Sequence, residues 1–409
     1  MTNLQDRTNL GLVFAIVALF VGCAIGQVRE TVLPAFANMR VTTAAPNVRM
    51  SELTSSDGQA GDNFGFSVAV DGSVLVASAP RFANLGQGSA YVYVNVGGTW
   101  AQVAKLTASD GGPGDRFGYS VAIVGKTIAV GNDVDGVYVF VEPVNGWTTM
   151  TETAKLVTGV YGGASVAISP NQQIILVGTP GGSCTGGVGV FYFPNGGWVN
   201  KTQSDGELDA PFGWLVAIKD GLVAVGSPTC GNSSSGSVYL FHMPFCRCRM
   251  IPFQTLVPTD STGGDRFGIS VSISEGTLLV GAPGRPAAYI FEYDGTGQAR
   301  QVAELTQSHP SNNCFACSVA LLRNLALVGA ETATVSHNLQ QGSTFTYVKP
   351  ANGWTDTSTA NAKFTAPDGG ANDFFGASIS LSSTEAAIGA TDHTVSGNAN
   401  QGAVYLFGK

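Results

Sequence analysis

The stretch GDRFGYSVAI occupies residues 114–123, and GDRFGISVSI occupies residues 264–273 with two letters changed. A phrase that recurs at this length usually marks a repeated structural unit. Its centre is an aromatic or small residue followed by a small residue, directly before a short apolar run. Seven such pairs occur along the chain: Phe64-Gly65, Phe117-Gly118, Gly162-Gly163, Phe212-Gly213, Phe267-Gly268, Phe315-Ala316 and Phe375-Gly376.

Each copy of the phrase is followed by further short apolar segments that are separated by Gly-rich turns. In the first repeat these are VLVASAP (residues 74–80), GSAYVYV (88–94) and the weaker WAQVAKLTASD (100–110). Short runs of β-branched and aromatic residues between turn residues are typical of β-strands, so each repeat has four strands. Four consecutive antiparallel strands form one twisted sheet, and seven such sheets bury their faces by standing around an axis. The chain is therefore predicted to be all-β, with a seven-bladed β-propeller over residues 51–409.

The two ends of the repeat array are complementary. The chain finishes on a third strand, GAVYLFGK (402–409), and the first repeat is preceded by an unpaired fourth strand, SELTSSD (51–57). Pairing these segments would remove an open sheet edge. We therefore expect the N-terminal strand to complete the last blade and close the ring.

The repeated FG phrase and the GAP turn at 281–283 resemble the FG-GAP repeats of integrin-α-type β-propellers, over about Ser51 to Lys409. That family includes adhesion receptors, secreted proteins and anchored surface proteins, so the resemblance implies recognition. Many of its members bind calcium in a DxDxDG-like hairpin after the first strand. Here hairpins such as VDGSV (70–74) and KDGLV (219–223) lack three alternating oxygen ligands, so this calcium site is not expected in them.

Aspartates recur at two positions in the loop that leads into each blade. One set lies seven residues before the motif Phe: Asp57, Asp110, Asp205, Asp260 and Asp368. A second set lies two residues before it: Asp62, Asp115, Asp265 and Asp373. These side chains either shape the Gly-rich loops as Asx turns or, as the pairs Asp57/Asp62, Asp110/Asp115, Asp260/Asp265 and Asp368/Asp373, bind Ca²⁺ weakly.

The Phe-Gly pairs themselves are predicted to be structural. A Phe at each position is expected to wedge between neighbouring blades, and the Gly lets the backbone turn closely into the inner strand. Cysteines also follow the repeat. Cys184 and Cys230 occupy equivalent loops, so they are a candidate disulfide, whereas Cys246-x-Cys248 with Cys314-x-x-Cys317 offers the alternative of a zinc site.

The N-terminus has a different character. Residues 10–22, LGLVFAIVALFVG, are apolar throughout and follow Arg7, so we expect a hydrophobic helix that meets a membrane. Residues 1–26 are then a signal peptide cleaved after Gly26, a lipidation signal at Cys23 or an uncleaved anchor. Residues 27–50 contain two prolines and are expected to form a linker or stem.

Several function classes are disfavoured by composition and motifs. The net charge is -8 and no Lys/Arg-rich run occurs, which argues against a nucleic-acid partner. HExxH and GxSxG motifs are absent from the sequence, so we do not expect an enzyme. Apart from weakly bound calcium, no cofactor is expected.

The sequence favours a non-catalytic recognition or adhesion module, extracellular or anchored at a surface, that binds a protein or glycan. The ligand would meet the face formed by the Asp-rich loops and by loops after the second strand, such as residues 80–88 and 331–342. Two alternatives stay open. One is a structural component of a cell coat or membrane-containing virion, held by an uncleaved anchor, and the other is an enzyme or lectin that uses the central funnel.

Overall fold

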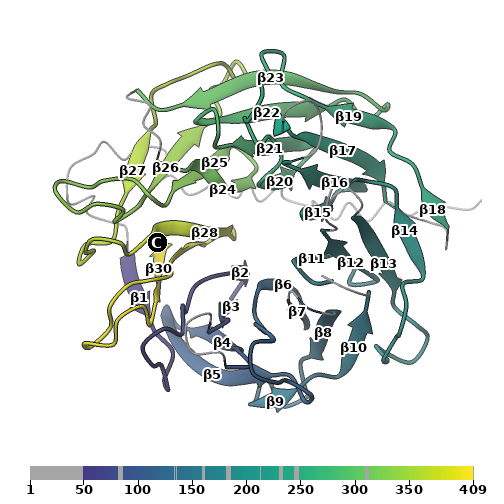
Figure 1. Ribbon diagram of the computed structural model, residues 1–409, viewed down its shortest axis with the longest axis vertical. Coiled ribbons are helices and arrows are strands. Elements are labelled where there is room, and N and C mark those ends of the chain that lie inside the picture. The colour runs from purple at the N-terminus through teal and green to yellow at the C-terminus, as the bar shows by residue number, and fades with distance from the viewer. Residues whose placement is uncertain are drawn as a thin grey trace, which may run out of the picture. The chain divides into compact units, whose positions relative to one another are not determined.

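The computed structural model describes residues 49–408, except 82–85, 133, 135, 159–161, 181–185, 212, 230–233, 244–247 and 309–312. All named elements of this part are β-strands, and they form seven sheets that follow one another around a ring (Figure 1). The predicted all-β, seven-bladed propeller of four-stranded blades is confirmed. Helices long and apolar enough to cross a bilayer do not occur among the described residues. The expected N-terminal helix and most of the linker lie outside them.

Each blade runs outward from an innermost strand. The innermost strands are β2 (Val68–Asp71), β6 (Ser120–Val124), β11 (Ser165–Ile168), β15 (Leu215–Lys219), β20 (Val271–Ser274), β24 (Phe315–Leu322) and β28 (Phe375–Leu381). The second strands are β3 (Val74–Ala79), β7 (Thr127–Gly131), β12 (Ile174–Thr179), β16 (Leu222–Ser227), β21 (Thr277–Ala282), β25 (Leu325–Ala330) and β29 (Glu385–Ala390).

The third strands are β4 (Ser89–Val96), β8 (Gly136–Val141), β13 (Gly187–Tyr192), β17 (Ser237–His242), β22 (Ala287–Tyr293), β26 (Ser343–Val348) and β30 (Ala403–Gly408). The fourth strands are β5 (Thr99–Thr107), β10 (Ala154–Val157), β14 (Gly206–Leu208), β19 (Gln254–Leu256), β23 (Ala299–Thr306), β27 (Ala362–Phe364) and, in the last blade, β1 (Arg49–Leu53). Second and third strands are buried on both faces because a blade packs on each side, so they read as continuous apolar runs.

The motif Phe fills the space between two blades. Phe117 is fully buried in one cluster with Val92 of the first blade and Tyr138 of the second. Its ring meets that of Tyr138 edge to face at 5.3 Å between centroids, a favourable aromatic geometry. The Phe residues at 64, 267 and 375 are likewise fully buried, whereas Phe212 lies outside the described residues. The described Phe residues are therefore buried, and their structural role stays a prediction.

A serine two residues after the motif pair links several neighbouring blades. The Ser120 hydroxyl donates to the carbonyl oxygen of Gly163 in the next blade at 2.8 Å. The same donation links Ser318 to Gly376 at 2.6 Å, and Ser378 of the last blade to Gly65 of the first at 2.6 Å. In these three pairs of blades, the phrase of one blade thus donates a hydrogen bond to the phrase of the next.

The first strand of the described residues lies in the last blade. β1 pairs antiparallel with β30, with Arg49 opposite Gly408 and Leu53 opposite Val404. The strand begins before the predicted residue 51 and ends at Leu53, because the chain turns there into the leading loop of the first blade. Two short strands that the sequence did not predict, β9 (Met150–Thr151) and β18 (Arg249–Met250), pair in parallel with fourth strands β5 and β14.

Candidate functional site

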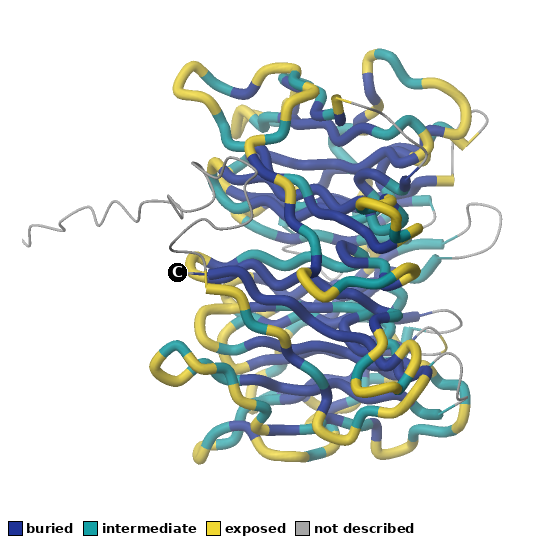
Figure 2. The backbone as a smooth tube through the Cα atoms, turned by 90° about the vertical axis from the view of Figure 1, so that its left-hand side faces the viewer, coloured by how far each residue is buried: buried dark blue, intermediate teal, exposed yellow. Residues whose placement is uncertain are grey.

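Two sets of loops share one face of the ring. The leading loops enter the first strand of each blade, and the second-strand loops follow the second strand. They lie on the same face because antiparallel strands alternate in direction, while the hairpins after the first and third strands lie on the opposite face. Figure 2 shows exposed residues mainly in loops at the ends of the strands, with buried strands between them. The predicted ligand face is therefore built from these two sets of loops.

The aspartates two residues before the motif Phe close turns in the leading loops. Asp62 accepts a hydrogen bond from the backbone N–H of Gln59 at 2.9 Å, and Asp115 accepts one from Gly112 at 2.6 Å. Asp265 and Asp373 accept the corresponding N–H three residues earlier in their own loops. Asp62 also forms an ion pair with Arg81 at 2.9 Å. This arrangement fits the interpretation of these residues as loop-shaping side chains.

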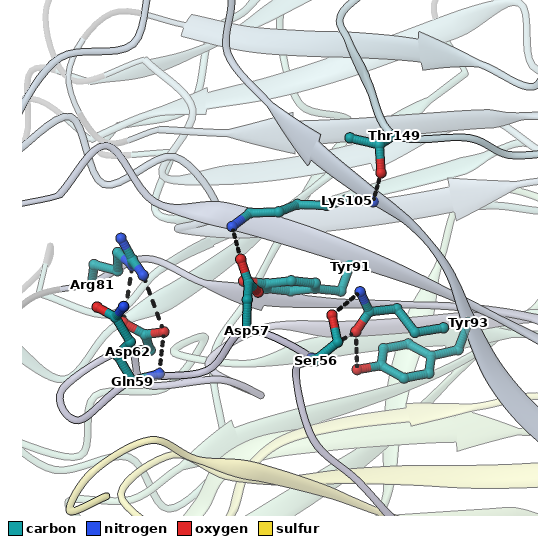
Figure 3. A network of polar contacts seen from close by, with 10 residues as sticks. Ser56, Asp57, Gln59, Asp62, Arg81, Tyr91, Tyr93, Lys105 and Thr149 are labelled. Carbon is teal, nitrogen blue, oxygen red and sulfur yellow. Dashed lines mark hydrogen bonds and ion pairs between the residues drawn. The ribbon is translucent and has the colours of Figure 1, made fainter.

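Asp57, seven residues before the motif Phe of the first blade, contacts side chains of the third and fourth strands of that blade (Figure 3). Asp57 accepts a hydrogen bond from the Tyr91 hydroxyl at 2.8 Å and pairs with Lys105 at 2.5 Å. The second blade repeats this arrangement, with Asp110 between Tyr138 at 2.9 Å and Lys155 at 2.7 Å. Asp205 does not lie in a leading loop as predicted, because it precedes the fourth strand β14 and pairs with Lys201 in the connection after the third strand.

These contacts fix the charge of the two carboxylates. Burial alone would raise the pKa of Asp57, but the hydrogen bonds from Lys105 and Tyr91 outweigh it and hold the pKa below its usual value. The pKa of Asp110 is lowered by the same combination of contacts, against the effect of burial. Both side chains are therefore charged at neutral pH and already have a cation beside them, which weakens their attraction for calcium.

Two groups of at least three potential metal ligands occur among the described residues. One contains Cys314, Cys317 and Glu331, and the other contains Glu52, Asp368 and His393. The four predicted calcium pairs do not appear as such groups, so calcium binding there stays a prediction. The sulfur atoms of Cys314 and Cys317 are joined in a disulfide, and Cys248 is also disulfide-bonded, which contradicts the alternative of a zinc site. Cys184, Cys230 and Cys246 lie outside the described residues.

The second-strand loops of the last two blades are exposed but internally braced. Val335 and Asn338 exchange backbone hydrogen bonds at 3.1 and 2.9 Å across the tip of one loop, and Val395 and Asn398 do the same in the next blade. The amide of Asn338 also donates to the Gly369 carbonyl of the neighbouring leading loop at 2.9 Å. Leu339 at the loop tip is 65% exposed. An apolar side chain is thus held outward on a braced loop.

Glu331 begins one of these loops and is a half-buried acid beside the Cys314–Cys317 disulfide. Burial raises its pKa to about 7, and the charge of Asp392 adds to the rise. Because the folded state holds this proton more tightly than the unfolded state, the ionised carboxyl destabilises the fold above pH 7. That destabilisation disappears as the pH falls toward the unfolded value of 4.5.

Substitution of Glu331→Gln should therefore stabilise the protein at pH 8 by about 2 kcal/mol, after allowance for partial exposure, and have little effect at pH 4.5. Chemical denaturation at both pH values measures this difference. An equal gain at the two pH values would mean that the carboxyl charge is not the cause.

A Gln-Gly pair before the third strand was not recognised in the sequence as part of the loop architecture. The backbone N–H of Phe117 donates to the Gln87 carbonyl at 2.8 Å, and that of Phe375 donates to the Gln341 carbonyl at 2.8 Å. In these two cases the second-strand loop thereby holds the backbone of the motif Phe of the next blade. The signal was present, because the Gln-Gly pair recurs at 87–88, 341–342 and 401–402.

Comparison with known proteins agrees with this architecture. Five segments match the family model described as FG-GAP repeat, at residues 48–93, 100–140, 201–241, 253–291 and 358–407, more than half of the chain. None of the curated proteins matches the chain. Among solved structures, the computationally designed Ika8 protein is similar, at 13% identity and a TM-score of 0.49, over 88% of this chain and 99% of that chain. The five matched segments show that this chain belongs to the FG-GAP repeat family.

Proposed function

We propose that the chain is a non-catalytic recognition module that binds a protein or glycan through the face formed by the leading and second-strand loops. The propeller fold of an FG-GAP repeat protein suits recognition in general, because a rigid ring holds many loops on one face. The observation that carries the proposal is the braced pair of loops in the last two blades. A loop that is ordered before binding loses less conformational entropy when its ligand arrives.

The module is proposed to act outside the cell or at a membrane surface. Support comes from the apolar segment at residues 10–22 and from the disulfide between Cys314 and Cys317, a bond that persists mainly in oxidising compartments. An uncleaved N-terminal segment on the native protein would instead favour the anchored component of a surface assembly. N-terminal sequencing of the native protein distinguishes the two.

We further propose that the pairing of β1 with β30 closes the ring. Leu53 of β1 is buried in a cluster that joins Val404 and Leu406 of the last blade to Phe64 and Tyr91 of the first. The Ser378 hydroxyl and the Gly65 carbonyl join the same two blades. Closure would keep the ligand loops of the first and last blades at fixed positions.

The Leu339→Asp variant should bind a ligand at least about 10-fold more weakly, since a charge replaces an exposed apolar contact at the loop tip. The ligand is first identified by screening the full chain, in detergent, against a glycan array and a library of secreted and surface proteins. The matched control is Val144→Asp. Val144 is fully exposed in the connection after a third strand, and therefore on the opposite face.

The two variants together separate the possible outcomes. Weaker binding by Leu339→Asp alone supports the proposed face. Equal loss in both variants, or loss only in Val144→Asp, would place the ligand elsewhere. Because both positions are exposed, neither change is expected to alter the melting temperature.

A further inference from the structure

Three metal-ligand side chains from distant parts of the chain meet in the last blade. Glu52 lies on β1, Asp368 lies in the leading loop of this blade, and His393 lies in its second-strand loop. The His393 Nε2 atom is 3.8 Å from a Glu52 carboxylate oxygen and 3.7 Å from an Asp368 carboxylate oxygen. One ligand atom from each residue lies within 4.8 Å of the other two.

The imidazole of His393 is held in one orientation. Its side chain is 9% exposed, and Nδ1 donates to the Asp373 carboxylate at 2.8 Å. An ionised carboxylate only accepts hydrogen bonds, so Nδ1 carries a proton, and Nε2 is the ring nitrogen on the side of Glu52 and Asp368, where a metal ion would take the place of a proton. Nε2 has no partner within hydrogen-bond distance among the described residues, because both carboxylates are farther than 3.5 Å. A carboxylate that orients a histidine in this way is typical of the outer shell of metal sites.

The fifth blade shows how the fold otherwise joins two such carboxylates. Glu304 pairs with Tyr289 of the third strand in the fifth blade, and Glu52 pairs with Tyr405 of the third strand in the last blade. The two glutamates therefore occupy equivalent positions. Arg285 is the third residue after its second strand, as His393 is in the last blade, and it contacts both Asp260 and Glu304. A permanent cation therefore bridges the two carboxylates in the fifth blade. In the last blade the equivalent residue is a histidine, which differs from arginine in that its Nε2 atom can bind a metal ion.

The spacing of the three groups matches ligands around one ion. Two bonds of about 2.1 Å at a tetrahedral angle place ligand atoms about 3.4 Å apart, close to the distances between His393 and the two carboxylates. The side chains of Glu52 and Asp368 are 34% and 49% exposed, so an ion can enter from solvent and keep a water ligand. An imidazole with two carboxylates suits zinc and similar divalent transition metals better than calcium, which prefers oxygen ligands.

We propose that Glu52, Asp368 and His393 bind a divalent transition-metal ion such as Zn²⁺, with Asp373 as the positioning residue. Glu52 belongs to β1, the first described strand, whereas the other two ligands come from the C-terminal part of the chain. The ion would therefore fasten the two ends of the propeller together. Because Glu52 is more than 300 positions from Asp368 and His393 in the sequence, metal binding would also stabilise the folded ring.

The test uses the full chain in detergent, without reductant so that the disulfides stay intact, and Zn²⁺ alone as the probe. Equilibrium dialysis with metal analysis should find one Zn²⁺ more per chain in the unsubstituted protein than in His393→Gln or Glu52→Gln. Zn²⁺ should raise the melting temperature of the unsubstituted protein and not that of these two variants. Asp373→Asn should bind about 10- to 100-fold more weakly, as expected when the group orienting the histidine is changed.

Two controls and one replacement make the result specific. His337→Gln removes an exposed histidine of the neighbouring blade, and Glu304→Gln removes the equivalent carboxylate of the fifth blade, so both should keep the zinc response. His393→Arg reproduces the fifth blade and should fold stably without binding the extra zinc. The proposal is overturned if the unsubstituted protein binds no more Zn²⁺ than His393→Arg, or if Zn²⁺ does not shift its melting temperature. His393 would then be a protonated ion-pair partner.

Discussion

Removing residues 1–53 is expected to lower the melting temperature of the propeller by about 10 °C, whereas removing residues 1–48 should leave it nearly unchanged. The longer deletion removes β1, whose five residues pair with β30 from Arg49 opposite Gly408 to Leu53 opposite Val404. It also removes the buried Leu53 side chain from the cluster between the last and first blades. Each lost strand hydrogen bond should cost about 1 kcal/mol, and the lost burial of Leu53 should cost about 2 kcal/mol. The free energy of unfolding should therefore fall by more than about 5 kcal/mol.

The shorter deletion is the matched control, because it leaves every pairing of β1 in place. Differential scanning calorimetry of both truncated proteins measures the effect, and a drop of this size is a large share of the stability of a typical domain. If the two truncated proteins melted at the same temperature, β1 would not be needed to hold the ring.

The Gly118→Ala substitution should destabilise the protein by about 4 kcal/mol. Gly118 has a φ of +102°, where residues with a side chain are strained. A Cβ atom at this position would lie 2.9 Å from both the Ser78 Cβ and the Ser89 carbonyl oxygen of the preceding blade. Gly114→Ala is the control, because Gly114 also has a positive φ of 87° but an added methyl group would have no neighbouring atom within 4 Å, so strain alone should cost about 1 kcal/mol.

The sixth blade suggests how this substitution can be rescued. Ala316 replaces the motif Gly there, and the residue it meets in the preceding blade is Gly281, where the first blade has Ser78. The double variant Gly118→Ala with Ser78→Gly should therefore recover part of the lost stability. Urea denaturation measures all three variants. A cost for Gly118→Ala no larger than that of Gly114→Ala would show that blade contact does not require glycine.

The sequence was sufficient for the fold because its signals are local and repeated. Strands, turns and the motif Phe recur in the same order, and blades pack on their sequence neighbours, so the number of repeats predicts the number of blades. Strand boundaries were less certain. β1 begins at Arg49 because its partner β30 extends to Gly408, and that register depends on a contact between opposite ends of the chain.

The chemistry of the loops was harder to predict, because side-chain partners are not sequence neighbours. Lys105 stands five residues before Asp110 in the sequence, yet it pairs with Asp57 from the leading loop of its own blade. The position shared by Arg285 and His393 was also missed, since it becomes visible only when the ends of the second strands are aligned in the structure. Likewise, a spacing of two residues between Cys314 and Cys317 suits a zinc site or a disulfide, and the geometry decides for the disulfide.

Hydrogen exchange of the backbone amides in residues 49–53 of the full chain tests the closed ring most directly. If β1 is the fourth strand of the last blade, its paired amides should exchange as slowly as those of the fourth strand β5 in the first blade. Exchange of the same segment at the rate of an unstructured peptide would contradict the closed ring and, with it, the zinc site that depends on Glu52.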